Sequence, residues 1–498
     1  MNKTVIASDY VTLDSNVHTG GGTDVTDILQ SLLDKAVEWG HVHLVMDGAA
    51  LIRGLTVHSN TTIECLDKEC GFYLMDDCNC ALLINSQPSY ADRRSRNITL
   101  IGGTYNHNCL HQLHDIPCND SALTSESPDN GGVLHLTVAL EFYGVENLTV
   151  RDVTIRDQRT FAFTVGNFKH VYIENTFIEL ENDIPYGNQD GFHFWGPGQF
   201  LTLRNVGGRT GDDFMNVGPD ERDGVSSITD VMIDGVFLDE AYQGIRLLSR
   251  GKGLLDRITI RNVTGTYRCY GFYINPWFID DSMGNFGNIV FENIDLRPLD
   301  NVYPNPPFLF SIGGDIESLT FRNIHWYHPG DTRNIFQIGY PFYDVNYEFK
   351  DKKPIVHFLM IDGMTVIEDS KLSADRQKEA GPLWLRFFGQ KLCGLSFSYR
   401  TSSISACTSS SLLIPMLPAA PSKARCALRM ASADALVITI SPPGFSRNRI
   451  LSPAFNPSAR RISTGTVICP SEEILAEYIF IPLLFPCLLL VVFIILLV

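Results

Sequence analysis

The sequence predicts an all-β fold, a parallel β-helix, preceded by a capping helix and followed by an irregular tail. Three observations support this prediction: a strand pattern that recurs through most of the chain, one amphipathic segment before it, and the loss of the pattern from about Gly381. We therefore divide the chain into an N-terminal segment with the capping helix at 1–40, a β-helix at 41–370, and a low-complexity tail at 381–498.

The capping helix is predicted at 23–40, "TDVTDILQSLLDKAVEWG". Its apolar side chains recur at helical spacing and form one stripe: Ile28, Leu29, Leu32, Leu33, Ala36 and Val37. Thr23 could cap the start and Gly40 the end. Since a solenoid must shield its first open coil from water, we expect this helix to cover that end.

The recurring pattern is an apolar alternation, a polar Asn or Asp, and a further apolar residue, as in "NLTVRDVTI" (147–155) and "NIVFENIDL" (288–296). The polar markers are Asp152, Asn175, Asn205, Asp234, Asn262, Asn293 and Asn323, separated by 23, 30, 29, 28, 31 and 30 residues. Alternation with period 2 inside such a repeat indicates stacked strands. Asn suits a corner with positive φ, so the markers are expected at turns between strands.

The charge distribution excludes one class of partner. The formal net charge is -17; residues 381–498 carry +6 and the preceding 380 residues carry −23. Nucleic-acid binding requires clustered Lys and Arg, so we expect no nucleic-acid partner. A monomer is expected.

Two features bear on location. The first twenty residues lack the apolar run of a secretory signal, so we interpret most of the six Asn-Xaa-Ser/Thr sequons as polar residues at strand entries: Asn2, Asn60, Asn97, Asn119, Asn147 and Asn262. The hydrophobic segment 479–498 is long enough to span a bilayer. It can be a membrane anchor or an appendage unrelated to the body, for example one translated out of frame.

Six of the twelve cysteines lie between Cys65 and Cys118. A disulfide or metal cluster is conceivable there, but small buried thiols in the core are the favoured interpretation.

Four consecutive segments align on a shared register. They are "DGFHFW" (190–195), "DFMNV" (213–217), "QGIRLL" (243–248) and "YGFYINPW" (270–277), with steps of 23, 30 and 27 residues. One parity is apolar and is expected in the core: Phe192, Phe194, Met215, Val217, Ile245, Leu247, Phe272 and Ile274. The other parity is expected to form an outward ladder about 4.8 Å per rung: His193, Asn216, Arg246 and Tyr273, with Trp195, Asn275 and Trp277 further along.

Three aspartates lie at the upstream edge of this ladder: Asp190, Asp212 and Asp213. Adjacent residues of a flat strand point to opposite faces, so we expect the turn at Gly211 to bend the chain and let both later acids reach outward. Carboxyl groups this close cannot all ionise, and at least one should have a raised pKa. A protonated acid beside an ionised one is what glycoside hydrolysis requires.

Other interpretations of these residues stay open. Aspartates at Gly-flanked turns also serve as corner residues, and acidic oxygen clusters can hold Ca²⁺. The two tryptophans, Trp195 and Trp277, could stack on sugars or pack at the surface, and His193 could bind substrate or be structural.

The quoted segments resemble glycoside hydrolase family 28, the polygalacturonase family, whose fold is a right-handed parallel β-helix. "NQDGFHF" (188–194) looks like that family's Asn-Thr-Asp-Gly-Ile-His-Val segment, and "GDDFMNV" (211–217) like its Gly-Asp-Asp-Cys-Ile-Ser-Ile segment. Residues 20–48 are similar to the entry of the wider pectin-lyase-like superfamily. The resemblance implies that Asp212 is the general acid and that Asp190 and Asp213 activate water.

Two family motifs are altered. The Gly-His-Gly segment falls on "YQGIRLLS", with Gln243 in place of the histidine. The Arg-Ile-Lys segment falls on "GFYINPW", with Tyr273 and Asn275 in place of the two cations that bind uronic carboxylates. Arg246 could supply a substitute charge. Without the two cations, a neutral or differently decorated polymer is favoured as substrate over polygalacturonate.

The leading hypothesis is an inverting glycoside hydrolase acting on an extracellular, pectin-like polysaccharide without metal or organic cofactor. The residues expected to bind substrate are Asn188, His193, Gln243, Arg246, Tyr273, Asn275 and Trp277. The alternatives are a non-catalytic glycan-binding β-helix, such as an adhesin or spike, and a Ca²⁺-dependent lyase with Arg246 as its base.

Overall fold

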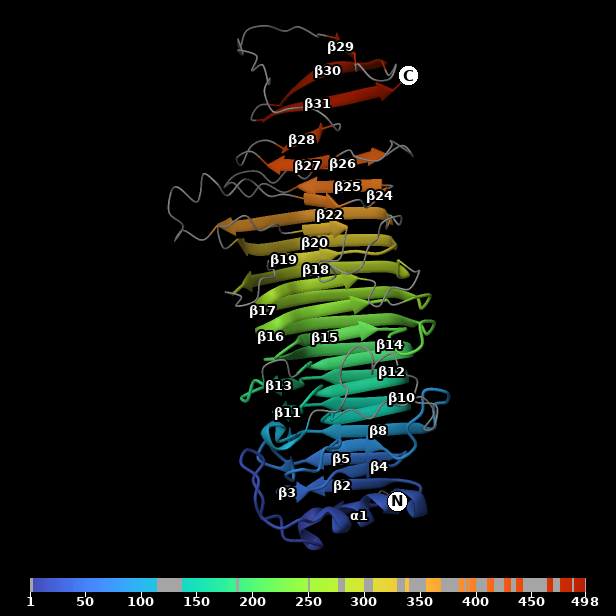
Figure 1. Cartoon of the computed structure of the whole chain (residues 1–498), viewed down its shortest axis with the longest axis vertical. Helices are drawn as coiled ribbons and strands as arrows, with labels where there is room; N and C mark the ends of the chain where they lie inside the picture. Colours follow the sequence, from blue (N-terminus) through green and yellow to red (C-terminus); the bar gives the residue numbers. More distant parts are fainter. Residues whose placement is uncertain are drawn as a thin grey trace. The chain divides into compact units, whose positions relative to one another are not determined.

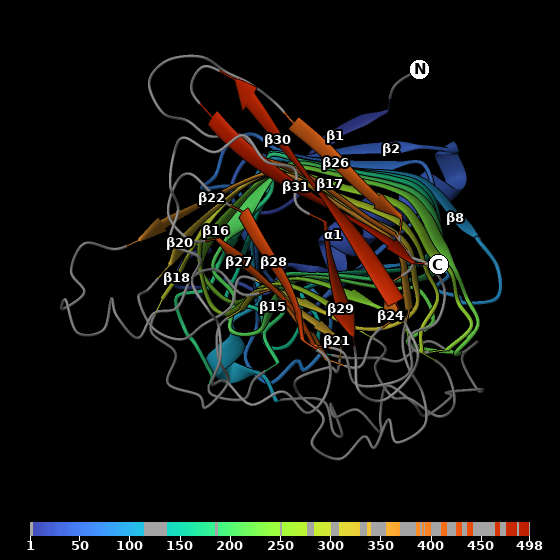
Figure 2. The same cartoon turned by 90° about the horizontal axis from the view of Figure 1, so that it is seen from above.

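The computed structural model describes residues 3–113, 137–184, 188–249, 251–275, 283–299, 308–328, 336–339 and 355–368, and then the individual strands from β23 to β31. The fold is a right-handed parallel β-helix, as the sequence predicts. Successive coils stack along one axis from β2 to β22 (Figure 1), and their strands superpose when viewed along that axis (Figure 2).

The strand pairings form three parallel ladders, and long strands bend from one ladder into the next. The first ladder contains β1 (Thr4–Ile6), β2 (Val42–Met46), β5 (Thr61–Cys65), β8 (Ser95–Ile101), β10 (Leu140–Arg151), β12 (Phe163–Glu174), β14 (Phe192–Gly208), β16 (Ile228–Leu248), β17 (Leu255–Asn275), β18 (Phe286–Pro298), β20 (Ile316–His328), β22 (Ile355–Glu368), β24 (Lys391–Leu392) and β25 (Gly394–Tyr399).

The second ladder contains β3 (Ala49–Ile52), β6 (Gly71–Leu74), β9 (Thr104–Asn106), β11 (Thr154–Arg156) and β13 (Phe177–Glu179), followed by later parts of the long strands. The third contains β4 (Leu55–Val57), β7 (Leu83–Asn85), the starts of β10, β12 and β14, then β15 (Asp213–Gly218), the ends of β16 and β17, β19 (Phe308–Ile312), β21 (Phe336–Gly339) and β23 (Leu385–Phe388).

Burial alternates along the strands, so that every second side chain enters one continuous core. The eight apolar residues predicted to face inward, from Phe192 to Ile274, all belong to that core. Burying this apolar area is the main favourable term that holds the coils together.

The capping helix α1 spans Thr26–Trp39 and lies beside β2 and β4 at the N-terminal end (Figure 1). Gly40 ends it with a φ of 80°, as expected. Its buried side chains are Thr26, Leu29, Leu32, Leu33 and Ala36, whereas the predicted stripe members Ile28 and Val37 are exposed. The apolar face by which α1 packs on the first coil is therefore narrower than the stripe predicted from the sequence. Two short 3-10 helices, η1 (Ala7–Asp9) and η2 (Cys109–His111), complete the helical content of the described residues.

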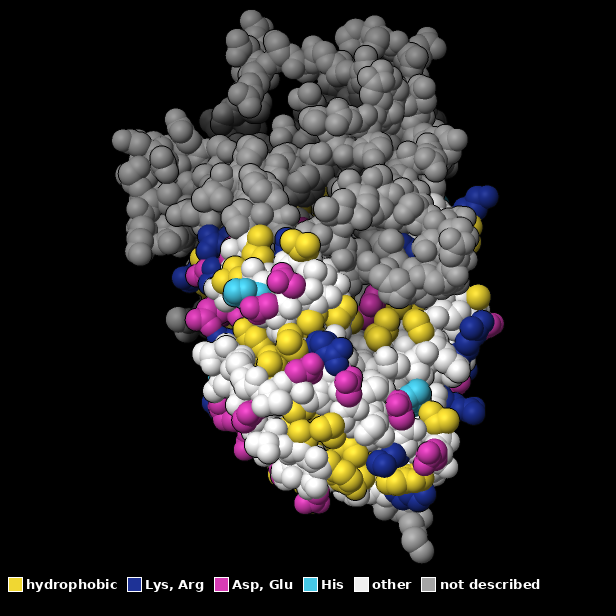
Figure 3. All heavy atoms as spheres, turned by 60° about the horizontal axis from the view of Figure 1, so that its bottom comes forward, with side chains coloured by type: hydrophobic (Ala, Val, Ile, Leu, Met, Phe, Trp, Pro, Cys, Tyr) yellow, Lys and Arg dark blue, Asp and Glu magenta, His cyan; other side chains and the backbone are white. Residues whose placement is uncertain are grey.

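The start of α1 differs from the prediction. Val25 occupies the cap position, and the Asp24 carboxylate accepts hydrogen bonds from the backbone N–H and hydroxyl of Thr26. Asp24 also pairs with Arg53, which contacts Asp27 as well. On the end of the molecule shown in Figure 3, acidic and basic side chains are accordingly interspersed.

Polar side chains stack at two corners of the coils. At one corner the amide of Asn97 donates to Asn60, and that of Asn147 donates to Asn97. At the other corner the amides donate along the series of predicted markers, from Asn175 to Asp152, Asn205 to Asn175, Asn262 to Asp234, Asn293 to Asn262, and Asn323 to Asn293. Four sequon asparagines are therefore members of these stacks, as strand-entry residues would be.

The positive φ expected at the markers occurs at all of them except Asp234, where the following Gly235 has a φ of 79°. Asp234 pairs with Arg204 and Arg261 in the strand register, which places Gly235 level with the neighbouring corner asparagines. The prediction for that coil is therefore off by one residue.

Beyond residue 368 the strands do not stop at the predicted boundary. In the segment expected to be an irregular tail, β23 pairs with β21, and β24 and β25 pair with β22. The remaining strands are antiparallel: β26 (Ser410–Pro415), β27 (Arg425–Met430), β28 (Leu436–Ser441), β29 (Thr464–Ile468), β30 (Leu475–Phe485) and β31 (Leu488–Leu497). Residues 444–498 form a separate unit.

Most of the hydrophobic segment 479–498 lies in β30 and β31. In the part of the chain that the structure describes, no helix combines the length and apolar character required to traverse a bilayer.

Three of the six clustered cysteines, Cys65, Cys70 and Cys109, are buried small side chains, as favoured. Burial raises the pKa of Cys109 to about 12 despite the nearby Arg159 charge. Cys78 and Cys80 are half-buried, and Cys118 lies outside the described residues.

The corner stack supplies a test of the fold. Asn293 donates to Asn262, accepts from Asn323 and has a φ of 55°. We expect Asn293→Ala to lower the free energy of unfolding by about 1–3 kcal/mol. The substitution removes two hydrogen bonds, and alanine tolerates the left-handed region less well than asparagine because it has no polar side chain to bond locally. Urea unfolding followed by circular dichroism measures the change.

Asn293→Gly is the matched control, since glycine tolerates this φ. It should lose less stability than the alanine variant. Equal losses would contradict a contribution from backbone conformation.

Candidate active site

The four aligned segments lie side by side on the third ladder, where β14, β15, β16 and β17 are adjacent. His193 pairs with Asn216, Asn216 with Arg246, and Arg246 with Tyr273. The register predicted from the sequence steps is therefore confirmed, because the side chains of one parity occupy successive rungs.

The outward face of this ladder is covered, in contrast to the solvent-accessible ladder that we expected. Asp190, His193, Asp213, Asn216, Tyr273 and Asn275 are each at most 3% exposed. Aromatic side chains bury part of this face. Trp195 is fully buried and stacks on Tyr143 at 6.0 Å, while Phe161 stacks on His193 at 4.3 Å. Of the two roles considered for Trp195, the structure favours packing.

Asp190 and His193 form the first part of the site. Asp190 precedes β14, and its Oδ2 lies 2.8 Å from Nδ1 of His193. The other ring nitrogen, Nε2, lies 3.0 Å from Oε2 of Glu221. The indole N–H of Trp195 donates to the same Glu221 oxygen at 2.8 Å. His193 therefore connects two carboxyl groups.

Asp212 and Asp213 form the second part. The Gln243 amide donates to Oδ1 of Asp212 at 3.0 Å, and Arg246 donates to Oδ2 of Asp213 at 3.4 Å. Both acids thus reach side chains of the next coil, as the bend predicted at Gly211 requires. Thr210 helps to shape this turn by donating from its hydroxyl to the Asp212 carbonyl oxygen at 3.0 Å.

Burial is the largest influence on all three aspartates and raises the pKa of each. For Asp212 the charges of Asp190 and Asp213 add to burial, so its pKa lies well above the ordinary value. The Arg246 charge opposes burial at Asp213, whose pKa rises to about 7. The hydrogen bond from His193 opposes burial at Asp190, yet the pKa of Asp190 remains raised.

Anionic neighbours raise the pKa of both cations of the site, although burial acts in the other direction. Burial alone would lower the pKa of His193, but the Glu221 charge and the hydrogen bonds with Asp190 and Glu221 raise it to about 10. Burial likewise disfavours the charged form of Arg246, but Asp213 first and other anions after it raise its pKa. At neutral pH both side chains are therefore cationic.

The other residues predicted to bind substrate have varied positions. Arg246 lies over the Tyr273 ring, 5.2 Å from its centroid, besides contacting Asp213. Asn275 pairs with Leu248 at the end of the ladder, and Asn188 is half-buried with a φ of 50° just before Asp190. Trp277 lies outside the described residues.

Sequence reasoning missed Glu221 as a member of this site. It belongs to "GPDERDG" (218–224), the connection after β15, where no periodic pattern predicts which side chain turns back to the ladder. One signal was present: charged residues directly follow the strand that Asp213 begins. Gly218 makes the approach possible, because a Cβ there would lie 2.6 Å from Oε2 of Glu221.

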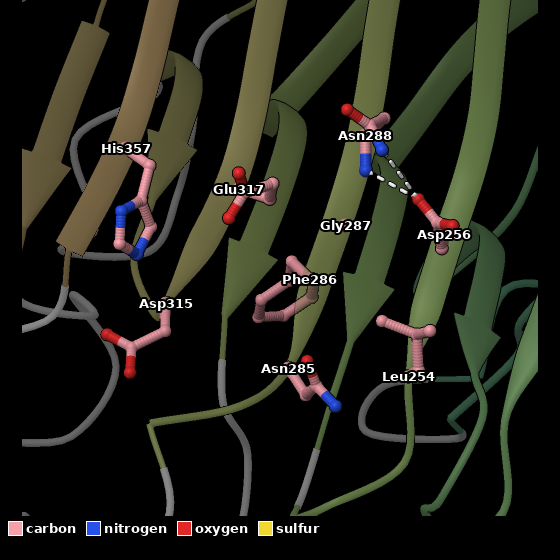
Figure 4. A pocket seen from close by; sticks show the side chains of 9 residues that line it. All are labelled: Leu254, Asp256, Asn285, Phe286, Gly287, Asn288, Asp315, Glu317 and His357. Atoms are coloured by element: carbon pink, nitrogen blue, oxygen red, sulfur yellow. Dashed lines mark hydrogen bonds between the residues drawn. The ribbon is translucent and has the colours of Figure 1, made fainter. Parts of the chain in front are cut away.

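A hollow in the described part of the molecule lies elsewhere. It has a volume of about 330 Å³ and is lined in part by Asp256, Asp315, Glu317 and His357, from β17 to β22 (Figure 4). At one side of this hollow, Asn288 donates hydrogen bonds from its backbone N–H and its side-chain amide to Oδ1 of Asp256. None of the predicted catalytic residues lines it. Within the described residues, no group of His, Cys, Asp or Glu side chains is arranged to hold a metal ion.

The raised pKa of His193 predicts a pH dependence of stability. A histidine that binds its proton more tightly when folded stabilises the fold fully below its unfolded pKa of about 6.5. This contribution is lost as pH rises toward about 10. Between pH 7 and 10 we therefore expect His193→Gln to flatten the fall of the unfolding free energy, by at most about 1.4 kcal/mol per pH unit. Urea titrations across this range measure the slope.

His43→Gln, which removes a half-exposed histidine of β2, is the control and should keep the wild-type slope. An unchanged slope in His193→Gln would contradict a protonated His193 in the folded state.

The curated relatives of this chain belong to the same class of protein as the family that its motifs resemble. The chain is 28% identical over 170 residues to a polygalacturonase of Brassica napus, covering 33% of this chain and 40% of the relative. It is 30% identical over 166 residues to a polygalacturonase of Medicago sativa, covering 32% of this chain and 36% of the relative. The chain thus spans well under half the length of these relatives.

Among solved structures, a hyperthermoactive exopolygalacturonase from Thermotoga maritima superposes with a TM-score of 0.44 and 12% identity, covering 83% of this chain and 94% of that one. No family model matches the sequence. The resemblance to glycoside hydrolase family 28, the polygalacturonase-like family, is nevertheless confirmed by the two curated relatives.

Proposed function

We propose that the chain is an inverting glycoside hydrolase that cleaves a pectin-like polysaccharide with Asp190, Asp212 and Asp213. The observation that carries this proposal is the convergence of the three carboxyl groups from two successive coils, with the pKa of each raised by burial. Inverting hydrolysis needs one carboxylic acid and one carboxylate on opposite sides of the scissile bond.

Asp212 has the properties of the general acid. The charges of Asp190 and Asp213 favour its protonated form, and it is the most exposed of the three, being half-buried where the other two are buried. Its proton passes to the glycosidic oxygen as the bond from that oxygen to the anomeric carbon breaks.

Asp213, assisted by Asp190, has the properties of the general base. Its Oδ1 is buried and makes no hydrogen bond within the described part of the chain, which leaves an acceptor for the attacking water. The water oxygen bonds to the anomeric carbon while its proton passes to the carboxylate. Proton exchange with solvent then restores the starting state.

The surroundings favour a substrate with few carboxylates near the scissile bond. Gln243 is occupied with Asp212, and Tyr273 and Asn275 carry no charge. The two cations of the aligned segments are already engaged with acids of the site, His193 with Asp190 and Glu221, and Arg246 with Asp213. A neutral or partly esterified stretch of a pectin-like polymer therefore suits the site better than a continuous polyuronate.

One alternative has an observation in its favour. The burial of Asp190 and Asp213 suits a glycan-binding β-helix in which the aspartates are structural. The lyase alternative is less well supported, because anionic neighbours hold Arg246 in its protonated form and an arginine must lose a proton before it can act as a base.

Substitution of the acid separates catalysis from binding. With the full chain we expect Asp212→Asn to lower the release of new reducing ends by at least about 10²-fold, since it removes the proton donor but keeps the side-chain shape. Retention on immobilised polysaccharide should persist. Polygalacturonate, esterified pectin, rhamnogalacturonan and neutral glycans are the substrates to compare.

Asp152→Asn is the matched control, because it makes the same change at an exposed corner of another coil, where asparagine is the common residue. It should keep full activity. Binding to a polysaccharide without turnover by the wild-type chain would contradict hydrolysis and support the glycan-binding alternative.

The pH profile tests the base. Because Asp213 must be ionised to accept a proton and its pKa is about 7, we expect kcat/KM to fall as pH decreases through about 7. Arg246→Gln removes the charge that opposes burial at Asp213, so the same limb should move to higher pH. Initial rates from pH 4 to 10 measure both profiles, and an acidic limb near pH 4 in the wild type would contradict this assignment.

A further inference from the structure

We propose that Glu221 is a positioning residue of the carboxylate site and that it acts on Asp190 through His193. This inference rests on the proposed function for its catalytic consequence, whereas the physical link between Glu221 and Asp190 can be tested without turnover. Glu221 itself is separated from Asp190 by the imidazole ring and contacts it through that ring.

With Asp190 and Glu221 both ionised, the geometry requires a doubly protonated ring. Nδ1 of His193 lies 2.8 Å from Asp190 and Nε2 lies 3.0 Å from Glu221, and an ionised carboxylate only accepts hydrogen bonds. A neutral imidazole would turn a nitrogen lone pair toward one of the two carboxylates. An imidazolium donates to both, and charge-assisted hydrogen bonds of this kind are short and strong.

Packing fixes the orientation of this unit. Phe161 stacks on the His193 ring at 4.3 Å with an interplanar angle of 14°, and Trp195 packs edge-on at 4.8 Å. The Trp195 indole also donates to Glu221 at 2.8 Å, so the carboxylate is held from two sides. A ring confined in this way can hold Asp190 in one rotamer, as outer partners do for metal-binding histidines.

The charged groups near His193 come from several elements, and the buried Arg222 lies over the Trp195 ring that packs on His193. Asp190 precedes β14, Asp213 begins β15, Glu221 follows β15, and Arg246 belongs to β16. Arg246 pairs with Asp213, the anion that raises its pKa most. Removal of Glu221 would leave His193 with one directly bonded carboxylate in a buried setting, and burial would then favour loss of the ring proton.

The consequence for the reaction is specific. With a neutral His193, the hydrogen bond to Asp190 loses its charge assistance, and Asp190 gains rotational freedom and a different proton affinity. The Glu221 carboxylate bonds to His193 and Trp195, so its replacement should leave the proposed substrate-binding residues Asn188 and Gln243 in place. The turnover number should therefore change much more than the Michaelis constant.

The experiment follows the His193 ring directly. Full-length chain labelled with ¹³C-histidine is titrated by NMR, and His193→Gln identifies the resonance. We expect His193 to remain protonated beyond pH 9 in the wild type and to titrate at least one pH unit lower in Glu221→Gln. Glu221→Asp, which keeps the charge, should retain a high titration.

Glu64→Gln is the matched control, because it breaks a histidine–carboxylate pair of β5 and β2 at the far end of the β-helix. It should leave the His193 titration unchanged. Melting curves establish that each variant is folded before titration.

Activity supplies the second measurement. We expect Glu221→Gln to lower kcat about 10- to 100-fold with KM within about threefold, and Glu221→Asp to restore most of kcat. A wild-type His193 that titrates near its ordinary pKa, or an identical titration in Glu221→Gln, would overturn the inference. If Glu221→Gln alters the His193 titration but the wild-type chain shows no turnover, the proposed function alone is overturned. The link between Glu221 and Asp190 is then retained.

Discussion

In-register pairing between successive coils is the constraint on which the rest of this molecule depends. Each residue of a parallel ladder lies above its counterpart in the previous coil, about one strand spacing away. Apolar residues so stacked form the continuous core, and asparagines so stacked satisfy one another at the corners. The same rule forces carboxyl groups together where aspartates occupy equivalent positions, as Asp190 and Asp213 do.

Burying several carboxyl groups close together costs free energy, and this cost explains which residues surround them. Four carboxyl groups, those of Asp190, Asp212, Asp213 and Glu221, share a buried region with the cations His193 and Arg246. A buried charge is tolerated only when it is paired and hydrogen-bonded. Each cation therefore engages an aspartate directly, and the remaining excess of negative charge is relieved by protonation. A carboxyl group that stays protonated can thus arise from a requirement of folding.

Much of this arrangement could be predicted from the sequence, because periodicity reports strand register. The coil steps of 23, 30 and 27 residues were sufficient to place His193, Asn216, Arg246 and Tyr273 on neighbouring rungs. The corner at Asp234 was misplaced because a glycine replaces the asparagine there, and the pattern followed the polar side chain.

Two features of the site could not be predicted for a physical reason. Alternation indicates which side chains point outward and is silent on what covers them, so the burial of Trp195 and Tyr273 required the structure. Connections between strands follow no period, which is why Glu221 escaped notice although it contacts His193.

The corner stacks have a consequence for how such a chain can change length. Where asparagines occupy three consecutive corners, the middle one bonds to the coil before it and the coil after it, as Asn293 does with Asn262 and Asn323. Excision or duplication of one whole turn would again bring asparagine against asparagine and leave the junction chemically matched. Evolution can therefore vary the number of turns on either side of a site while the turns that build it stay intact.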